Sequence, residues 1–358
     1  MCRWFAYISP TEPCLLEDVL ITPKHSLVKQ VHEHYLPGLV PRNPKSLGDD
    51  VLVRARNSAH NIDGLGVAWY TSSSADFENG DSGLSADSTW KEGLRPAAYK
   101  TIVPPINDIN FRSICANTES RIVFSHIRAA SGTPIVHTNN HPFIFGRHTC
   151  MHNGVVSNFS TIRRAMCARM NGYAYAAILG STDSEHIFAL YMTYLTEKHG
   201  GDQASWEREY SVKEMATALH DAVATVLNLQ EEYLGTKRTP NSLNLCVTDG
   251  TKLVAYRLRN HANQDPPSLY YSTKAGTTLN RKYEDHPDGA HIQDDSGRKP
   301  RSKHGKHLIV ASEPSTYHAN DWHLIGREQM LLADEKGGVR VEDIPYDKKW
   351  DAEDPTIK

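Results

Sequence analysis

The sequence predicts an α+β fold in which most of the sheet is antiparallel. Predicted strands and helices come in blocks along the chain, whereas a parallel sheet would need strict alternation of strand and helix. From Leu243 onward the periodicity becomes that of strands, and Thr248–Thr251 is typical of a hairpin turn between strands at 243–247 and 252–256. The chain has no internal repeat, so we expect one continuous fold.

The first part of the chain is predicted to be mostly strand. Arg3–Ile8 is an apolar run that suits a buried strand. His25–Tyr35 has apolar residues at helical spacing and is predicted as a helix. Three later segments again favour strands: 64–70, 121–127 and 142–151.

Three helices and two late strands complete the predicted elements. Asn158–Met170 is predicted as a helix, and Val212–Tyr233 as a long amphipathic one. Thr182–Lys198 begins with a capping residue and has acidic residues in its first turn, as helices favour. The late strands are 307–311 and 329–333.

These elements are predicted to form one domain at residues 1–345. Two polar insertions interrupt it, at about residues 72–92 and 276–306. The first is rich in Ser, Asp and Gly, and the second is dense in charged residues and poor in apolar ones, as loops and disordered segments are. Residues 346–358 are predicted to form a polar tail.

The composition argues against several classes of protein. The formal net charge of the 358 residues is −3, so no basic field indicates a nucleic-acid partner. No apolar stretch of about 18 residues spans a membrane, and no N-terminal signal segment is present. The six cysteines lack CxxC spacing and are expected to be reduced thiols. We expect a soluble, cytoplasmic protein.

No metal or other cofactor is expected, although the chain contains 19 histidines. Their spacing matches no standard ligand pattern such as HExxH. His148 and His152 are four residues apart, but they lie on a predicted strand, where such a pair does not converge.

Cys2 follows Met1 directly and is small enough for removal of that methionine to be expected. The new first residue then carries a thiol with a pKa of roughly 8.5 and an α-amine with a pKa of roughly 7.7–8.0. The amine accepts the thiol proton and later returns it to a leaving amine. Cys2 is therefore a candidate nucleophile that carries its own base.

Five motifs occur in an order that resembles the class II glutamine amidotransferase domain of the N-terminal-nucleophile hydrolases. The resemblance implies a four-layer αββα sandwich of two antiparallel sheets, and hydrolysis of an amide bond. The motifs are Met1-Cys2-Arg3, Asp63-Gly64-Leu65-Gly66, Ser125-His126-Ile127-Arg128-Ala129-Ala130-Ser131, His152-Asn153-Gly154-Val155-Val156-Ser157-Asn158 and Gly180-Ser181-Thr182-Asp183-Ser184-Glu185.

A narrower resemblance extends to about residue 335. Thr22-Pro23-Lys24-His25-Ser26, Asn140-His141-Pro142-Phe143 and Ala311-Ser312-Glu313-Pro314 are similar to stretches of the amidotransferase-type subunits of the fungal glutathione-degrading (Dug) complex. That resemblance implies a γ-glutamyl small-molecule substrate, glutathione or glutamine, and a protein partner of metallopeptidase type.

The resemblance also implies how a γ-glutamyl group is held. Arg128 matches the arginine that binds the α-carboxylate, because a guanidinium pairs bidentately with a carboxylate. Asp183 matches the aspartate that binds the α-ammonium. Ser131 falls where a threonine often also contacts the carboxylate. The structural alternatives are an ion pair for Arg128 and helix capping for Asp183.

Three further residues match the catalytic positions of the family. Cys2 would attack the γ-carbonyl, while the Asn153 side chain and the Gly154 backbone N–H would stabilise the oxyanion. The structural alternative for Asn153-Gly154 is a tight hairpin turn. His126 and His152 are expected to support the site rather than to act as acid or base, because the α-amine is the base.

The function that follows is hydrolysis of a γ-glutamyl amide, most plausibly in glutathione or a γ-glutamyl conjugate, through a Cys2 thioester. A first alternative is a glutaminase subunit that delivers ammonia to a separate synthase. A second alternative is an inactive scaffold for a partner peptidase. One departure bears on this choice: Ala129 stands where the glucosamine-synthase branch of the family has a tryptophan.

Overall fold

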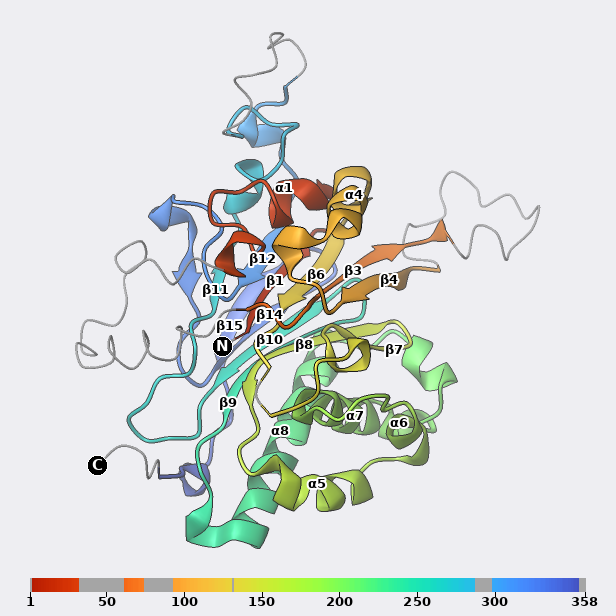
Figure 1. Ribbon diagram of the computed structural model, residues 1–358, viewed down its shortest axis with the longest axis vertical. Coiled ribbons are helices and arrows are strands. Elements are labelled where there is room, and N and C mark those ends of the chain that lie inside the picture. Colours follow the sequence, from red (N-terminus) through yellow and green to blue (C-terminus); the bar gives the residue numbers. More distant parts are fainter. Residues whose placement is uncertain (1, 32–60, 74–92, 131, 287–297, 354–358) are drawn as a thin grey trace.

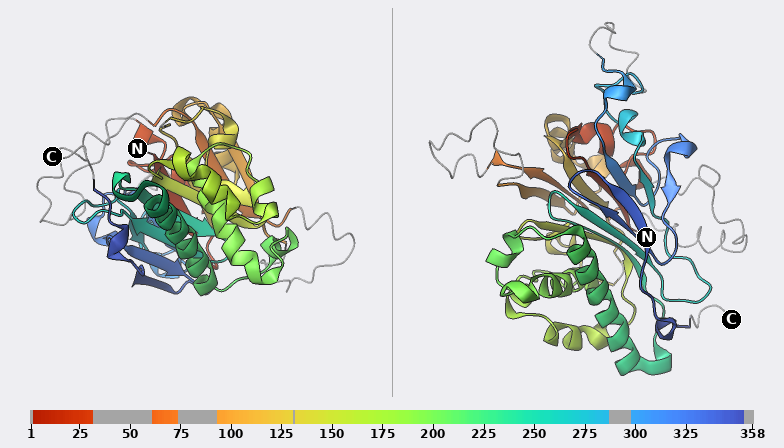
Figure 2. Two further views of the ribbon diagram at one scale, coloured as in Figure 1. Left: turned by 90° about the horizontal axis from the view of Figure 1, so that it is seen from below. Right: turned by 180° about the vertical axis from the view of Figure 1, so that it is seen from behind.

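The structure of the chain is a computed structural model that describes residues 2–31, 61–73, 93–130, 132–286 and 298–353. Two antiparallel sheets pack face to face, and helices cover both outer faces (Figure 1). The two further views show the same order of layers from below and from behind (Figure 2). The predicted α+β sandwich of four layers is confirmed.

The larger sheet has seven strands, and the first strand of the chain lies in its middle. All its pairings are antiparallel. In sheet order the strands are β13 (His323–Leu324), β11 (Tyr270–Ser272), β12 (Leu308–Ala311), β1 (Arg3–Ile8), β6 (Ile122–Ile127), β3 (Leu65–Thr71) and β4 (Arg95–Thr101).

The second sheet has six strands, again with antiparallel pairing throughout. In sheet order they are β15 (Val339–Asp343), β14 (Gln329–Ala333), β10 (Leu253–Leu258), β9 (Ser242–Thr248), β8 (His148–Val155) and β7 (Phe143–Phe145). A separate two-stranded ribbon pairs β2 (Cys14–Leu15) with β5 (Glu119–Ser120).

Helices form the outer layers (Figure 1). The short α1 (Leu16–Leu20) and α4 (Ile109–Asn117) pack on the seven-stranded sheet. The larger helical layer on the six-stranded sheet consists of α5 (Phe159–Ala168), α6 (Gly172–Ala176), α7 (Asp183–Thr196) and α8 (Val212–Leu234).

The alternation of side chains along β1 explains how the layers are held together. Trp4 and Ala6 point into the core between the two sheets, whereas Phe5 and Tyr7 point into the core under α1. Because successive side chains of a strand face opposite sides, a fully apolar strand serves two cores at once.

Most predicted elements are confirmed to within two residues, but two differ. The sequence predicts one strand over 142–151, whereas the structure has β7 and β8 joined at Gly146, whose φ of 55° suits glycine. The predicted helix 25–35 is wrong over its described part. Residues 25–31 form turns and one 3₁₀ segment, and Lys29 Nζ donates to the carbonyl of Pro23 at 2.8 Å.

Some residues of the predicted insertion and tail are packed, although 299–303 and 347–349 are exposed. Tyr283 is fully buried, and its hydroxyl donates to Glu12 Oε2 at 2.8 Å. Trp350 is 8% exposed and donates from Nε1 to Asn228 Oδ1 at 2.8 Å. Among the helices of the described residues, none combines the length and apolarity needed to cross a bilayer.

Candidate active site

Cys2 and Arg128 lie at neighbouring strand ends of the seven-stranded sheet, and Asn153 of the second sheet is linked to the start of β1 through Ser312. Arg3 pairs with Ile127 in register, so Cys2 at the start of β1 lies beside Arg128 at the end of β6. The Ala129 N–H donates to Cys2 Sγ at 3.3 Å, and the thiol donates to the Ala129 carbonyl at 3.5 Å. The sequence motifs did not identify this backbone clamp, because it depends on strand register.

Burial and the neighbouring polar groups have opposite effects on the pKa of the Cys2 thiol. Burial raises the pKa of the Cys2 thiol above its ordinary value. The Ala129 N–H and the positive charges of Arg128 and Arg3 act in the opposite direction without overcoming it. A thiol that is largely protonated at neutral pH needs a base before it can attack.

Arg128 is a buried cation that is held by neutral groups. Only 4% of the residue is exposed. Its Nη1 donates to the Pro134 carbonyl at 3.1 Å and to Asn140 Oδ1 at 3.2 Å, and Nη2 donates to Thr133 Oγ1 at 2.6 Å. No acidic side chain of the described residues forms an ion pair with it. The described residues therefore do not support the structural alternative, in which Arg128 would form an ion pair.

The groups that hold Arg128 come from the loop after β6, and sequence reasoning did not assign them. Asn140 also donates from Nδ2 to the Thr101 carbonyl at 2.8 Å, which ties the loop to β4. Gly64 leaves room for this amide, since a Cβ there would lie 2.4 Å from Asn140 Nδ2. The sequence motif around Asn140 could have indicated a functional role, but the contact of Asn140 with Arg128 could be found only from the fold.

Asn153 and Gly154 lie within β8 and not in a hairpin turn. They pair with Asn244 and Leu243 of β9. Gly154 has φ 152°, and a Cβ there would lie 1.7 Å from the Ser242 carbonyl, so this backbone requires glycine.

The Asn153 amide is buried and only weakly held. The residue is 1% exposed, its Nδ2 lies 3.5 Å from Ser312 Oγ, and its Oδ1 has no hydrogen-bond partner among the described residues. Ser312 Oγ also accepts from the backbone N–H of Trp4 at 3.0 Å, two residues from Cys2. The weak contact leaves Nδ2 available to a stronger acceptor.

Asp183 is the first residue of α7 and lies beside the end of β8. Its Oδ2 accepts from the Val156 N–H at 2.7 Å, and its Oδ1 accepts from the Ser184 N–H at 2.8 Å. The cap itself is Thr182, so Asp183 does not act as the N-cap. Its negative charge acts to raise the pKa of Arg128, against the lowering effect of burial. Ser131, the remaining predicted binding residue, lies outside the described residues.

Three histidines fill the space behind the site and are neutral. Burial lowers the pKa of His126 to about 3, and lowers those of His141 and His152 as well. His126 lies 3.2 Å from the carbonyl of His152 through Nε2 and stacks on His141 with ring centroids 4.1 Å apart. These contacts support the strand that carries Asn153 and leave no charged imidazole for proton transfer at neutral pH.

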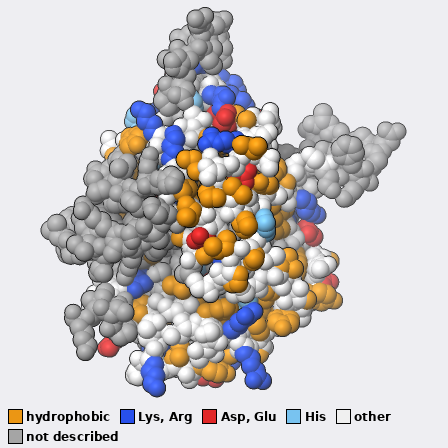
Figure 3. Space-filling view, in the orientation of Figure 1, with side chains coloured by type: hydrophobic (Ala, Val, Ile, Leu, Met, Phe, Trp, Pro, Cys, Tyr) orange, Lys and Arg blue, Asp and Glu red, His pale blue; other side chains and the backbone are white. Residues whose placement is uncertain are grey.

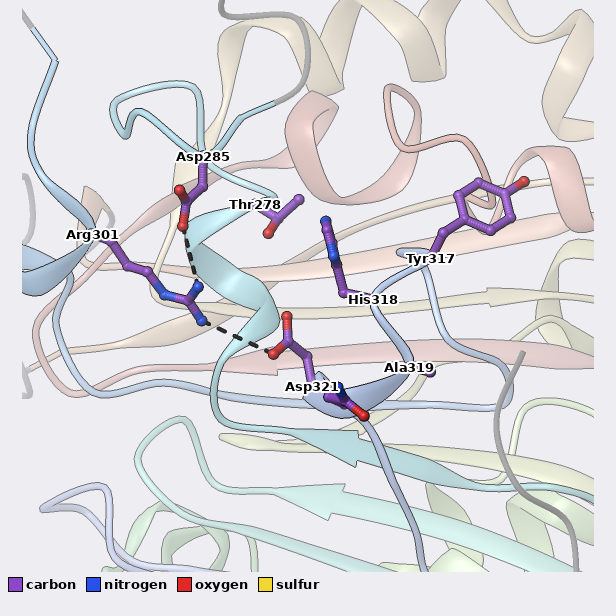
Figure 4. A pocket seen from close by; sticks show the side chains of 8 residues that line it. Thr278, Asp285, Arg301, Tyr317, His318, Ala319 and Asp321 are labelled. Atoms are coloured by element: carbon purple, nitrogen blue, oxygen red, sulfur yellow. Dashed lines mark ion pairs between the residues drawn. The ribbon is translucent and has the colours of Figure 1, made fainter. Parts of the chain in front are cut away.

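Two adjoining cavities lie elsewhere, on the α1 side of the seven-stranded sheet. Their volumes are about 570 and 180 Å³, and none of the predicted site residues lines them. Figure 4 shows Arg301 in the larger one, with Asp285 at 3.5 Å and Asp321 at 4.0 Å. Within the described ranges, no cluster of three or more His, Cys, Asp or Glu side chains is arranged to hold a metal ion.

Comparison with known proteins gives one family. The model of the class II glutamine amidotransferases matches residues 51–355. The chain is 28% identical over 333 residues to the probable glutamine amidotransferase DUG3 of Saccharomyces cerevisiae, covering 92% of this chain and 81% of that protein.

Solved structures agree on the fold. One is a glutamine aminotransferase class-II domain protein from Silicibacter pomeroyi, with TM-score 0.54 and 21% identity, covering 96% of this chain and 99% of that chain. Another is an allosteric regulatory enzyme of purine biosynthesis, with TM-score 0.50 and 12% identity, covering 96% of this chain but 49% of that chain.

Proposed function

Because the chain belongs to the class II glutamine amidotransferases, we propose that it hydrolyses the γ-glutamyl amide of glutathione or a related conjugate and releases glutamate. The observation that carries the proposal is Arg128. It is a buried guanidinium beside Cys2 without a carboxylate partner among the described residues. Burying a charge without a counter-charge is costly, and a substrate carboxylate would remove that cost.

The γ-glutamyl group would be recognised at its amino-acid end. Its α-carboxylate would bind the guanidinium of Arg128, whose planar fork suits two parallel hydrogen bonds. Its α-ammonium would bind the carboxylate of Asp183, which retains acceptor capacity beyond its two backbone contacts. Ser131 would give a second hydrogen bond to the carboxylate. This end of the substrate is common to glutathione and glutamine.

The reaction begins once Met1 is removed. The α-amine of Cys2 takes the thiol proton, and Sγ bonds to the γ-carbonyl carbon as the carbonyl π electrons move to oxygen. The Asn153 Nδ2–H and the Gly154 N–H stabilise this oxyanion. The C–N bond then breaks, the leaving amine takes the proton from the α-ammonium, and a thioester remains. Water hydrolyses the thioester, which frees glutamate and the thiol.

The leaving group distinguishes the alternatives. Loss of ammonia would make the protein a glutaminase subunit, whereas loss of cysteinylglycine would make it a glutathione hydrolase. Ala129, whose backbone contacts Cys2 Sγ, carries only a methyl group where the glucosamine-synthase branch has a tryptophan, which favours a larger leaving group. The resemblance of three further stretches to the glutathione-degrading subunits supports the same choice.

A protein partner of metallopeptidase type belongs to this proposal. Two exposed apolar side chains stand next in sequence to residues of the arginine site: Ile102 follows Thr101 and is 42% exposed, and Ile135 follows Pro134 and is 47% exposed. Hydrophobic side chains also spread over the middle of the described surface in Figure 3, while Lys and Arg lie mainly toward its margins. A partner that covers such a rim would complete the mouth of the site and receive the released dipeptide.

The test is turnover by wild type, Cys2→Ala and Cys167→Ala, with glutathione and glutamine in parallel. Glutamate release from glutathione by wild type, its loss in Cys2→Ala and its retention in Cys167→Ala are expected. Cys167 is a partly exposed thiol away from the site and serves as the matched control. Release from glutamine alone would overturn the assigned substrate. Normal turnover by Cys2→Ala would overturn the mechanism.

A further inference from the structure

Two sequence motifs have no part in the γ-glutamyl chemistry, yet the structure brings them together next to the nucleophile. His25 comes from the motif Thr22–Ser26, and Glu313 comes from the motif Ala311–Pro314. Their side chains meet with Nε2 of His25 2.9 Å from Oε2 of Glu313. The other oxygen of Glu313 accepts from Arg3 Nε at 2.8 Å. One carboxylate therefore joins the two motifs to the residue after Cys2.

The cluster is buried and charged. Arg3 is 5% exposed, His25 4% and Glu313 1%. Burial acts to raise the pKa of Glu313, but Arg3 and His25 outweigh it and hold that pKa below its ordinary value. Buried ionic groups are a weak source of net stability, so their presence calls for another reason.

That reason is the main chain of Cys2. Arg3 Nη1 donates to the Cys2 carbonyl at 3.0 Å, so the guanidinium holds Glu313 on one edge and the nucleophile's peptide group on the other. With Met1 removed, this peptide group is the only covalent link between Cys2 and the fold. A terminal residue that is tied by one bond frays unless its groups are anchored.

Two anchors are enough to orient the residue. The bond to Arg3 fixes the plane of the peptide group and therefore the axis about which Cys2 can rotate. The contact of Sγ with the Ala129 N–H at 3.3 Å fixes the rotation about that axis. The direction of the α-amine then follows, because it shares the same Cα.

We propose that Glu313, Arg3 and His25 are positioning residues that hold the Cys2 main chain so that its thiol and α-amine face the substrate carbonyl together. This inference rests on the proposed function of Cys2 as the nucleophile. The carboxylate of Glu313 orients the Arg3 fork, and His25 orients the carboxylate. Their effect is on the alignment of the attacking thiol and not on substrate binding, because the groups proposed to bind the substrate are Arg128 and Asp183.

The loop that carries Glu313 reaches the oxyanion site as well. Its neighbour Ser312 donates its backbone N–H to the Trp4 carbonyl at 2.9 Å and lies against the Asn153 amide. One loop thus fixes the nucleophile strand and the oxyanion donor relative to each other. A displacement of about 1 Å between such groups costs about 100-fold in rate.

The experiment compares wild type, Glu313→Gln and Glu17→Gln. Glutamine keeps the shape of Glu313 and removes its charge. Glu17→Gln is the matched control, because it breaks an exposed pair with Arg281, at 2.7 Å, that does not touch Cys2. Intact mass first establishes that Met1 has been removed from each protein. Two rates of Cys2 labelling are then measured, one with a diazo-ketone analogue of glutamine and one with iodoacetamide.

For Glu313→Gln, kcat is expected to fall about 100-fold with KM unchanged, and diazo-ketone labelling to fall at least about 10-fold. Iodoacetamide labelling should stay within about 3-fold of wild type, because a small electrophile needs no alignment with a bound γ-glutamyl group. Glu17→Gln should match wild type in all four quantities. Unchanged kcat, or a loss shared equally by both labels, would overturn the positioning role.

Arg3→Lys keeps the test decisive should Glu313→Gln fail to fold. Lysine retains the charge but cannot bridge the carboxylate and the Cys2 carbonyl with one planar fork. The same selective loss of diazo-ketone labelling is expected. A wild-type Cys2 that the diazo-ketone never labels would overturn the proposed function itself, which separates that failure from failure of the positioning role alone.

Discussion

Arg128 illustrates what a single side chain does in this site. Its donors are shared among two carbonyl-type acceptors and one hydroxyl, all neutral, while its charge stays uncompensated by any described acidic partner. Such a residue is held in place because the loop after β6 surrounds it, and it can attract an anion because no acidic side chain of the described residues forms an ion pair with it.

Arg128→Lys is therefore expected to raise KM for the γ-glutamyl substrate by about 10–100-fold, with a smaller change in kcat. An ammonium keeps the charge but cannot make two parallel bonds to a carboxylate, which removes roughly 1.5–3 kcal/mol of binding. Steady-state kinetics of glutamate release measure both constants. Unchanged KM would show that Arg128 does not hold the α-carboxylate.

Residue-level prediction is possible where chemistry leaves a mark in short motifs. Cys2, Asn153 and Gly154 could be proposed as catalytic residues because a nucleophile, an amide donor and a glycine carry recognisable patterns. The Ala129 N–H, the Thr133 hydroxyl and other supporting groups could not, because any residue supplies an amide and hydroxyls are common. Their role depends on which strands lie side by side, and that information is spread over the whole chain.

At the scale of elements, the first turn of α7 is the most informative one, because it begins with Asp183. Thr182 caps it by accepting from the Glu185 N–H at 3.2 Å, and the next residue is Asp183. The helix α8 has an independent cap, Ser211, which accepts from the Glu214 N–H at the same distance of 3.2 Å. The two caps allow stability to be separated from function.

Thr182→Ala and Ser211→Ala should each lower the free energy of unfolding by about 1 kcal/mol, since each leaves one backbone donor without its acceptor. Only Thr182→Ala should also raise KM, because loosening the first turn of α7 moves the Asp183 carboxylate. Chemical denaturation and steady-state kinetics on the two variants measure both effects. Equal KM values in the two variants would remove α7 from substrate binding.

Element boundaries were predictable where capping and periodicity agree. The start of α7 at Thr182 and the hairpin between β9 and β10 follow local rules that the structure confirms. The segment 25–31 fails because its apolar spacing comes from turns that lie on the sheet, not from a helix. Strand β4 was missed because only one of its seven residues is buried, which leaves no apolar alternation to detect.

At the scale of the whole molecule, buried carboxylates make stability depend on pH. Asp249 is fully buried and accepts from the backbone N–H groups of Thr251 and Lys252, both at 2.8 Å. Burial acts to raise its pKa, but the Lys252 ammonium, at 3.0 Å, and other neighbouring charges hold the pKa of Asp249 below its ordinary value. Glu313 behaves in the same way.

A folded-state pKa below the unfolded value gives stability that is present above roughly pH 4 and lost as the pH falls through the folded-state value. The urea midpoint is therefore expected to drop on acidification below about pH 4. Asp249→Asn should reduce the slope of the unfolding free energy against pH on the acid side by up to about one bound proton. It should also lower the free energy of unfolding at neutral pH. Urea unfolding at a series of pH values measures the slope. An identical slope in both proteins would exclude Asp249 as a source of the acid sensitivity.

The central place of β1 has a consequence for how the protein is made. The strand β1 pairs with β12, where Phe5 meets Ala311, a residue far along the chain from it. Closing so long a loop is slow, and the sheet cannot be completed until most of the chain exists. A nascent or truncated chain that ends before β12 carries Cys2 on an unfinished sheet edge, without Ser312 and Glu313. The support that Ser312 and Glu313 give to the start of β1 therefore forms only once β12 and the loop after it have been made.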